Sequence, residues 1–191
     1  IRWLKHKSKE WNGDPANFGV LGSSSGGHIA QLLAMRQHDA RYAAIPLPEA
    51  PHIDATFSYV ATRSPISNPV ARRAQAERKG NKEMMKKSDT FFNPPETIHE
   101  GNPQEILDRK EKVNLLPMLI MQGGLDDNVI PEIQEKFAAT YRAAGGECQL
   151  EIFKDSEHEW TAVPSPEADL SHETVKQFIA KQLRALQKKA A

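Results

Sequence analysis

The stretch Gly22-Ser23-Ser24-Ser25-Gly26 has the form G-x-S-x-G and directly follows the apolar run Phe18-Gly19-Val20-Leu21. A strand that runs through such a stretch into a helix places the central serine on a sharp turn with strained backbone angles. Side chains two positions before and after that serine would collide, so both positions require glycine. Only Ser24 has glycine at both positions, Gly22 and Gly26. The spacing therefore indicates Ser24 as a candidate nucleophile.

Two other interpretations of this stretch are a loop that only turns the chain and a loop that cradles a phosphate. Apolar residues follow with helical spacing, at Ile29, Leu32, Leu33 and Met35, so a helix begins where a nucleophile turn needs one. A dinucleotide-binding loop would read G-x-G-x-x-G, and a P-loop would end in Gly-Lys-Ser or Gly-Lys-Thr. The stretch has neither form, and the context favours the nucleophile turn of a serine hydrolase.

Length and charge exclude several classes of protein. The chain has 191 residues, with 25 basic and 25 acidic side chains and a formal net charge of zero, which fits one domain or a large part of one. A dedicated nucleic-acid-binding protein would show a basic excess, so we expect no nucleic-acid partner. No apolar run approaches the length of a membrane-spanning helix, so we expect no membrane span.

Cysteine and histidine usage argues against a metal or disulfide framework. Cys148 is the single cysteine, which excludes an internal disulfide and a multi-cysteine metal site. We expect it to pack as a small apolar residue near the start of a strand. The seven histidines form no H-E-x-x-H pattern, so we predict no metal site.

Apolar periodicity predicts alternating helices and strands. Helices are expected near 2–11, 26–37, 69–79, 80–88, 132–144 and 167–188, the last with Leu170, Val175, Phe178, Ile179 and Leu183 on its apolar side. Strands are expected at 18–21, 53–60, 116–122 and 149–153. This alternation predicts an α/β fold with a mostly parallel sheet and helices on both faces.

The segment 61–113 differs from the rest, because it is rich in Pro, Asn, Arg and Lys. We expect it to form a cap or insert within a single domain that spans 1–191. Its basic cluster is predicted to be a solvated helix face rather than an anion site, and comprises Arg72, Arg73, Arg78, Lys79, Lys82, Lys86 and Lys87. Its large apolar residues either line a pocket or pack the cap onto the core: Met84, Met85, Phe91 and Phe92.

A serine nucleophile needs a base, and the base needs an orienting carboxylate. Asp126 and Asp127 follow the strand expected at 116–122, and His158 follows the strand expected at 149–153. Groups at the carboxyl ends of parallel strands meet at one edge of the sheet. In strand–helix hydrolases these residues occur in the order Ser, Asp, His. The sequence therefore predicts that Ser24, one of these two carboxylates and His158 come together.

With these motifs the chain resembles the α/β-hydrolases, in particular the acetyl-esterase-like and feruloyl-esterase-like enzymes related to the prolyl oligopeptidase group. That family has its acid in a G-x-x-D-x-x-V loop, which Gly123, Asp126 and Val129 match. The resemblance implies that Asp126 is the acid. Its rival is Asp127, as an exposed loop carboxylate or an N-cap near the helix that begins around Pro131.

The histidine motif departs from the family pattern. The family histidine is usually followed by Gly-Phe, whereas His158 is followed by Glu159 and Trp160. Trp160 is expected to take the aromatic role. His172 is a weaker candidate for the base because it lies at the start of the last predicted helix, and His28 is expected to pack or cap locally.

The resemblance implies hydrolysis of a carboxylic ester, with a small, sugar or aryl substrate, through an acyl-enzyme and without a cofactor. His158 would accept the proton of Ser24, and Asp126 would hold the imidazole. The backbone N–H of Ser25 would donate to the oxyanion. Two alternatives stay open: a prolyl oligopeptidase-like serine peptidase, and a catalytically inactive binding homologue.

The family places further strands, and the loop with the second oxyanion donor, before the segment that resembles residue 2 onward. We therefore expect this chain to be the C-terminal part of an α/β-hydrolase, without its N-terminal strands. Three explanations are open: an excerpt of a longer sequence, a cleaved chain whose N-terminal fragment stays bound as a partner, or a degenerate homologue. We expect one of the first two, because all three catalytic candidates remain. No feature of the sequence indicates a cellular compartment.

Overall fold

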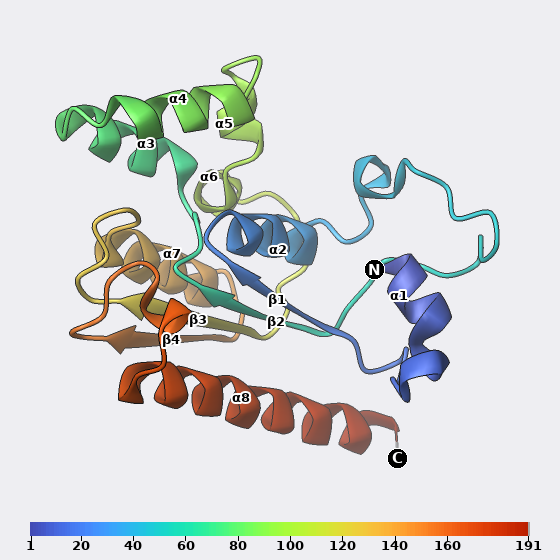
Figure 1. Cartoon of the computed structure of the whole chain (residues 1–191). Helices are drawn as coiled ribbons and strands as arrows, with labels where there is room; N and C mark the ends of the chain where they lie inside the picture. The colour runs from blue at the N-terminus through green and yellow to red at the C-terminus, as the bar shows by residue number, and fades with distance from the viewer. Residues whose placement is uncertain (191) are drawn as a thin grey trace.

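Four parallel strands form the centre of the molecule in a computed structural model that describes residues 1–190 (Figure 1). They are β1 (Gly19–Ser23), β2 (Tyr59–Arg63), β3 (Met118–Gly123) and β4 (Cys148–Phe153). Their order in the sheet is β1-β2-β3-β4, and every pairing is parallel. The parallel sheet expected from the sequence is confirmed.

Helices cover both faces of this sheet, as expected (Figure 1). On one face lie α2 (Ser25–Met35), α6 (Pro103–Asp108) and α7 (Pro131–Ala143), and on the other lies α8 (Pro166–Ala190). The cap, which we define as residues 69–101 with α3 (Pro69–Arg78), α4 (Lys82–Phe91) and α5 (Thr97–Glu100), stands above the first face. The remaining elements are α1 (Arg2–Lys7), η1 (Ser8–Trp11), η2 (Ala40–Ala43) and η3 (Trp160–Ala162).

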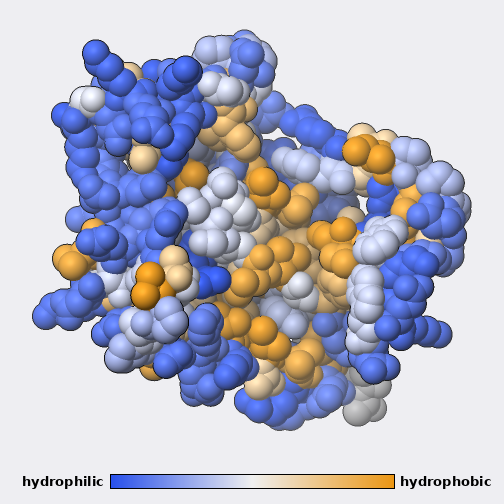
Figure 2. All heavy atoms as spheres, viewed as in Figure 1, coloured by the Kyte–Doolittle hydropathy of each residue, from blue (hydrophilic) through white to orange (hydrophobic). Residues whose placement is uncertain are grey.

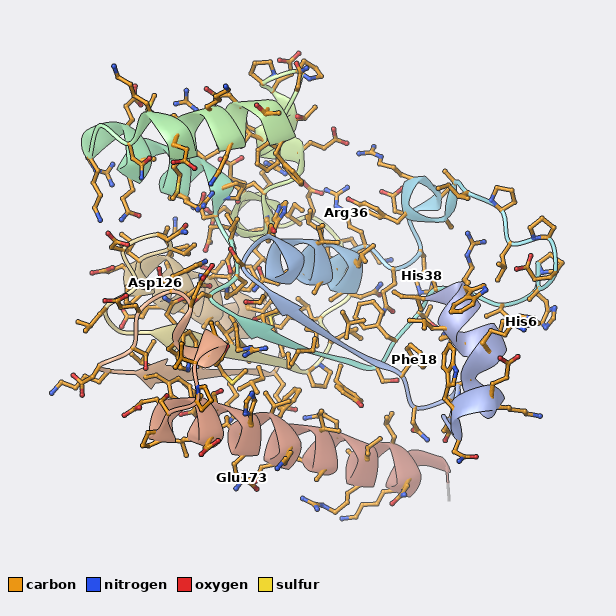
Figure 3. All side chains as sticks on the ribbon, viewed as in Figure 1. His6, Phe18, Arg36, His38, Asp126 and Glu173 are labelled. Carbon is orange, nitrogen blue, oxygen red and sulfur yellow. The ribbon has the colours of Figure 1, made fainter. Side chains whose placement is uncertain are left out.

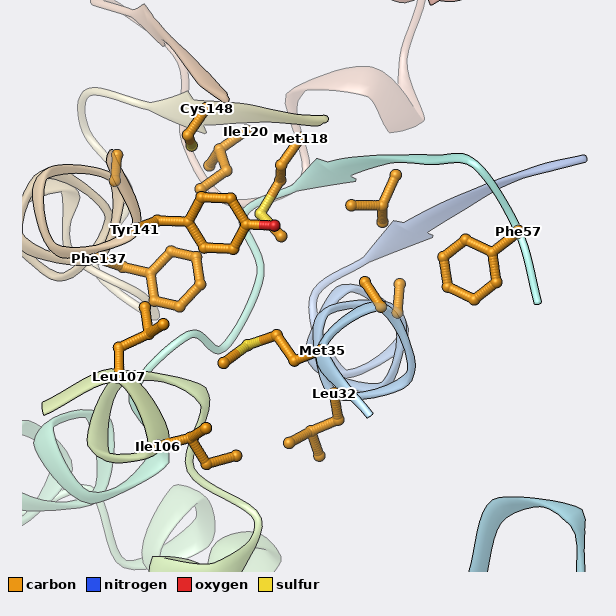
Figure 4. Packing of buried hydrophobic residues seen from close by; sticks show 14 residues of the cluster. Leu32, Met35, Phe57, Ile106, Leu107, Met118, Ile120, Phe137, Tyr141 and Cys148 are labelled. Atoms are coloured by element: carbon orange, nitrogen blue, oxygen red, sulfur yellow. The ribbon is translucent and has the colours of Figure 1, made fainter. Parts of the chain in front are cut away.

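Strand β3 shows how the two faces are filled. Successive side chains of a strand point to opposite faces, and all six residues of β3 are buried. Met118 and Ile120 pack with α2, α6 and α7, in the cluster that Figure 4 shows from close by. Leu119 and Met121 pack on the other side with Phe178 of α8. A strand covered on both faces reads as a continuous apolar run, which is why this strand was predictable.

The first two strands differ from expectation. The apolar run 18–21 would suit a buried strand, but Leu21 is 51% exposed, because β1 is the edge strand of the described sheet. A strand was expected from Ile53, whereas β2 begins only at Tyr59. The Asp54 side chain accepts hydrogen bonds from the backbone N–H and the hydroxyl of Thr56, and this local turn replaces strand pairing there.

The extent of the insert and the burial of Leu170 also differ from expectation. The insert was expected to be 61–113, but residues 61–63 belong to β2, and Ile106 of α6 is fully buried in the core. Within the expected insert, the cap is the part that stands apart from the sheet (Figure 1). Leu170 was expected on the apolar side of the last helix, but it is 59% exposed because α8 turns Ala168 and Ser171 inward instead.

Apolar atoms also gather in the middle of the face seen in Figure 2, between the hydrophilic cap and the region of α1. Half-exposed apolar side chains of the chain include Leu21 in β1 and Ile29 in α2. Within residues 1–190, no helix has both the length and the hydropathy needed to cross a membrane.

Candidate active site

Ser24 lies between the end of β1 and the start of α2 with a left-handed backbone, φ 50° and ψ −116°. Non-glycine residues rarely adopt a positive φ, and such strain gathers at functional sites. Three backbone hydrogen bonds hold the turn: the Ser24 N–H donates to Arg63 O at 2.8 Å, and Ser24 O accepts from the N–H groups of His28 at 3.0 Å and Ile66 at 3.4 Å. The strained strand-to-helix turn expected at Ser24 is therefore present.

The steric demand on the flanking glycines is unequal. A Cβ on Gly22 would lie 2.4 Å from the carbonyl oxygen of Gly26, so position 22 admits only glycine in this backbone. A Cβ on Gly26 would meet no atom within 4 Å. The collision expected at Gly26 is absent, because this residue contributes its backbone oxygen to the turn and its side-chain position faces open space.

Three side chains from separate strand ends form one hydrogen-bonded chain. His158 Nδ1 lies 2.8 Å from Asp126 Oδ2, and His158 Nε2 lies 3.0 Å from Ser24 Oγ. A carboxylate only accepts, so Nδ1 carries the proton and donates to Asp126. Nε2 of the neutral ring then accepts from the Ser24 hydroxyl. This arrangement has the geometry needed for a base to take the proton of a serine nucleophile.

Asp126 is the most buried of these three side chains, with 2% of its surface exposed. Figure 3 labels it near the carboxyl end of the sheet. Its Oδ1 accepts the backbone N–H groups of Asn128 at 3.0 Å and Val129 at 2.8 Å. Burial opposes ionisation of Asp126, but the hydrogen bonds from His158 and Val129 outweigh it and keep the pKa of this carboxyl below its usual value. Asp126 is therefore held as a carboxylate.

Gln122, at the end of β3, is a supporting residue that the sequence did not indicate. Its fully buried Nε2 donates to Asp126 Oδ2 at 3.0 Å, Val129 O at 2.9 Å and Gly123 O at 3.0 Å. It thus binds the carboxylate oxygen that also faces His158. A glutamine inside an otherwise apolar strand was the available signal, because a buried amide must find partners.

Ser25 opens α2, and the first N–H groups of a helix have no partner within the helix. This residue is exposed and lines the same pocket as Ser24. Its N–H also lies at the positive end of an eleven-residue helix. The position is suited to stabilise negative charge next to Ser24.

A pocket of about 330 Å³ opens beside Ser24 and His158. The cap supplies Arg72, Phe91 and Phe92 to its wall, whereas Met84 and Met85 do not line it. His28 also borders this pocket. It is buried, donates from Nε2 to Gly101 O at 2.6 Å, and packs edge-on against both phenylalanines, so it joins α2 to the cap as well as packing locally.

The rival residues lie elsewhere. Asp127 is exposed and 3.6 Å from Lys79, and it does not cap α7, whose N-cap is Ile130. His172 is exposed on α8. Trp160 stacks on Phe153, with 5.3 Å between ring centroids.

Cys148 begins β4 and is buried, as expected, and burial raises the pKa of its thiol to about 12. It therefore stays protonated and packs as an apolar group. Within residues 1–190, no three His, Cys, Asp or Glu side chains gather as a metal site would require.

Structural comparison finds the fold of this chain in several solved esterases. Esterase B from Lactobacillus Rhamnosis matches with a TM-score of 0.73 at 15% identity, over 99% of this chain and 60% of that protein. Carboxyl esterase 2 from the fungus Tuber melanosporum matches with a TM-score of 0.69 at 17% identity, over 95% and 59%. A propionate-bound esterase from Thermogutta terrifontis matches with a TM-score of 0.64 at 20% identity, over 94% and 61%. The chain spans about 60% of the length of these proteins and shares their fold.

Sequence comparison identifies the family. No curated protein sequence matches the chain. The family model described as "Prolyl oligopeptidase family" matches residues 1–185, nearly the whole chain. Together with the parallel sheet, these matches confirm the resemblance inferred from the sequence motifs. The chain belongs to the prolyl oligopeptidase family and has the α/β-hydrolase fold.

Proposed function

We propose that this chain carries the catalytic residues of a serine hydrolase that cleaves carboxylic esters through an acyl-enzyme. The observation that carries the proposal is the continuous hydrogen-bonded chain from Ser24 through His158 to Asp126. The esterase folds of the structural neighbours support an ester as the substrate.

In the proposed reaction Ser24 Oγ attacks the ester carbonyl while His158 Nε2 takes its proton. Asp126 keeps the imidazole in the correct tautomer and stabilises its charged form. The Ser25 N–H donates to the oxyanion of the tetrahedral intermediate, and one such donor typically contributes on the order of 10²–10³ in rate. His158 then returns the proton to the leaving alcohol, and water hydrolyses the acyl-enzyme by the same steps.

Labelling with a fluorophosphonate probe, read by intact mass, tests the nucleophile. We expect one adduct on the unmodified chain and none on Ser24→Ala. Ser23→Ala is the matched control, because it removes a neighbouring serine of the same stretch, and it should label fully. Folded protein that takes no adduct would refute the proposal and favour an inactive homologue.

A second candidate is a serine peptidase, which the family match to prolyl oligopeptidases favours. Both activities use the same three residues and differ in the leaving group. Comparison of 4-nitrophenyl acetate with 4-nitroacetanilide, and of a peptidyl ester with its peptidyl 4-nitroanilide, separates them. We expect turnover of the esters with little turnover of the amides. Comparable turnover within the peptidyl pair would assign the chain to the peptidases instead.

A further inference from the structure

Arg72 is the basic residue of α3 that lies in the candidate active site. Its guanidinium borders the pocket that Ser24 and His158 open into, and its side chain is only partly exposed. Burial lowers the pKa of this guanidinium, while the nearby Asp126 carboxylate acts in the opposite direction. An arginine stays charged at neutral pH under such conditions. The proposed catalytic pocket therefore contains a fixed positive charge.

Three neighbouring basic side chains of the cap have carboxylate partners. Arg73 pairs with Asp89 at 2.6 Å, Lys87 pairs with Glu83 at 2.7 Å, and Lys79 lies 3.6 Å from Asp127. Arg72 forms no ion pair with any carboxylate of residues 1–190. Its contacts are from Nε at 3.0 Å and Nη2 at 2.7 Å, both to the amide oxygen of Asn128.

The Arg72–Asn128 contact leaves N–H donors of both residues available to a ligand in the pocket. Both of these bonds use Asn128 Oδ1, and within residues 1–190 neither the Asn128 amide nitrogen nor Arg72 Nη1 forms a hydrogen bond. Both residues line the pocket. A planar guanidinium beside a second N–H donor suits the two oxygens of a carboxylate.

A purely structural role, in which Arg72 only links α3 to the loop of residues 123–129, does not explain why an arginine lies at this position. Helix α3 already holds the loop of residues 123–129 through Gln75, which donates to Asp127 O at 3.1 Å, and its C-cap residue Lys79 donates to that oxygen at 3.2 Å. A partly buried charge that bonds only a neutral amide is a costly way to add a third link.

We infer that Arg72, with the amide of Asn128, binds a carboxylate on the substrate, so that the enzyme prefers esters that carry a negative charge. This inference rests on the proposed function. Lys87, at the same pocket, adds positive charge, although Glu83 partly neutralises it. Glu159 is the carboxylate that faces this pocket and opposes the preference. Arg72 is thus a specificity-determining residue.

Binding to the Ser24→Ala chain tests the inference without turnover. Two matched pairs place the charge on either side of the ester: 3-acetoxybenzoate with its methyl ester, and phenyl hydrogen adipate with phenyl methyl adipate. In calorimetric titrations we expect the acid of at least one pair to bind on the order of 10-fold tighter than its neutral partner. This difference should shrink as salt is added. Equal affinities within both pairs would overturn the inference.

Variants assign the preference to the guanidinium. In the Ser24→Ala background, Arg72→Met should remove the difference and Arg72→Lys should retain part of it. Arg78→Met removes the same charge from an exposed position of α3 and should retain it fully. A preference that survives Arg72→Met would refute the assignment. A failed fluorophosphonate reaction would refute the proposed hydrolase while leaving this binding result intact, so the two failures are distinguishable.

Discussion

Residues 123–129 and helices α3 and α4 border the same candidate active site, but their polar groups are satisfied in different ways. In the loop, the buried Asp126 accepts hydrogen bonds from His158, Gln122 and two backbone N–H groups. In the cap, exposed ion pairs such as Lys87–Glu83 predominate, and such pairs contribute about 0–1 kcal/mol each. Substitution of the buried, hydrogen-bonded carboxylate of the loop should therefore affect catalysis strongly, and substitutions of exposed side chains in the loop or the cap should not.

The largest contrast is expected at Asp126. Asp126→Asn removes the charge that stabilises the imidazolium and favours the wrong tautomer of His158, so kcat should fall on the order of 10³–10⁴-fold. Steady-state hydrolysis of 4-nitrophenyl acetate measures the loss. Asp127→Asn is the matched control, since it removes an exposed carboxylate next in sequence, and it should change kcat less than about threefold. Similar losses in the two variants would remove Asp126 from its proposed role.

The second largest loss of kcat is expected at Gln122, which acts as a positioning residue for Asp126. Gln122→Leu leaves two buried carbonyl groups and one carboxylate oxygen without this donor, so unfolding free energy should fall by about 1–3 kcal/mol. We expect kcat to fall on the order of tenfold. Urea unfolding and ester hydrolysis measure the two effects.

A second variant separates positioning from stability. Gln122→Glu places a like charge beside Asp126, which raises the pKa of that carboxyl. The acid limb of the pH–rate profile should then move to higher pH. A lower rate with an unmoved acid limb would mean that Gln122 serves stability alone.

The same contrast explains what the sequence predicts well. Ser24, Asp126 and His158 each follow a strand, and parallel strands bring such positions to one edge, so order and spacing predict their proximity. The choice of Asp126 over the adjacent Asp127 comes from the G-x-x-D-x-x-V motif. Gln122 carries no motif, because its role exists only once the loop folds back over the end of β3. Arg72 looks like its basic neighbours in the sequence, since only the packed position of α3 separates a residue at the pocket from a solvated one.

The predicted start of β2 was wrong because local hydrogen bonds outweighed the apolar pattern. Residues 53–58 alternate enough to predict a strand, but the Asp54 side chain binds the backbone of Thr56 and delays the strand to Tyr59. The short helix α6 went unpredicted, although Asn102 caps it and Pro103 opens it, which is a recognisable helix start.

His28 provides a smaller, pH-dependent test of how the cap is attached. Burial lowers the pKa of His28 from its ordinary value of 6.5, although its hydrogen bond to Gly101 opposes this shift. The folded protein therefore binds this proton less readily than the unfolded chain. Stability should be fully present above pH 6.5 and should fall as the pH decreases from there towards the folded pKa, with a slope of at most about 1.4 kcal/mol per pH unit.

The non-titrating variant His28→Asn isolates this contribution. Unfolding free energies of the two proteins, measured from pH 8 to pH 5, should diverge in slope only below about pH 6.5, the ordinary pKa of histidine. Identical slopes would show that His28 titrates alike in the folded and unfolded chains.

Lys79 should give the smallest effect, and it tests the comparison directly because it joins the cap to the loop. Its ammonium is half exposed and lies 3.6 Å from the Asp127 carboxylate and 3.2 Å from the Asp127 carbonyl oxygen. Lys79→Met should therefore lower unfolding free energy by less than about 1 kcal/mol and change kcat less than about twofold. Gln75, which donates to the same carbonyl, keeps the link in this variant. A loss of kcat as large as that of Gln122→Leu would mean that the cap, and not the buried hydrogen bonds of the loop, sets the position of Asp126.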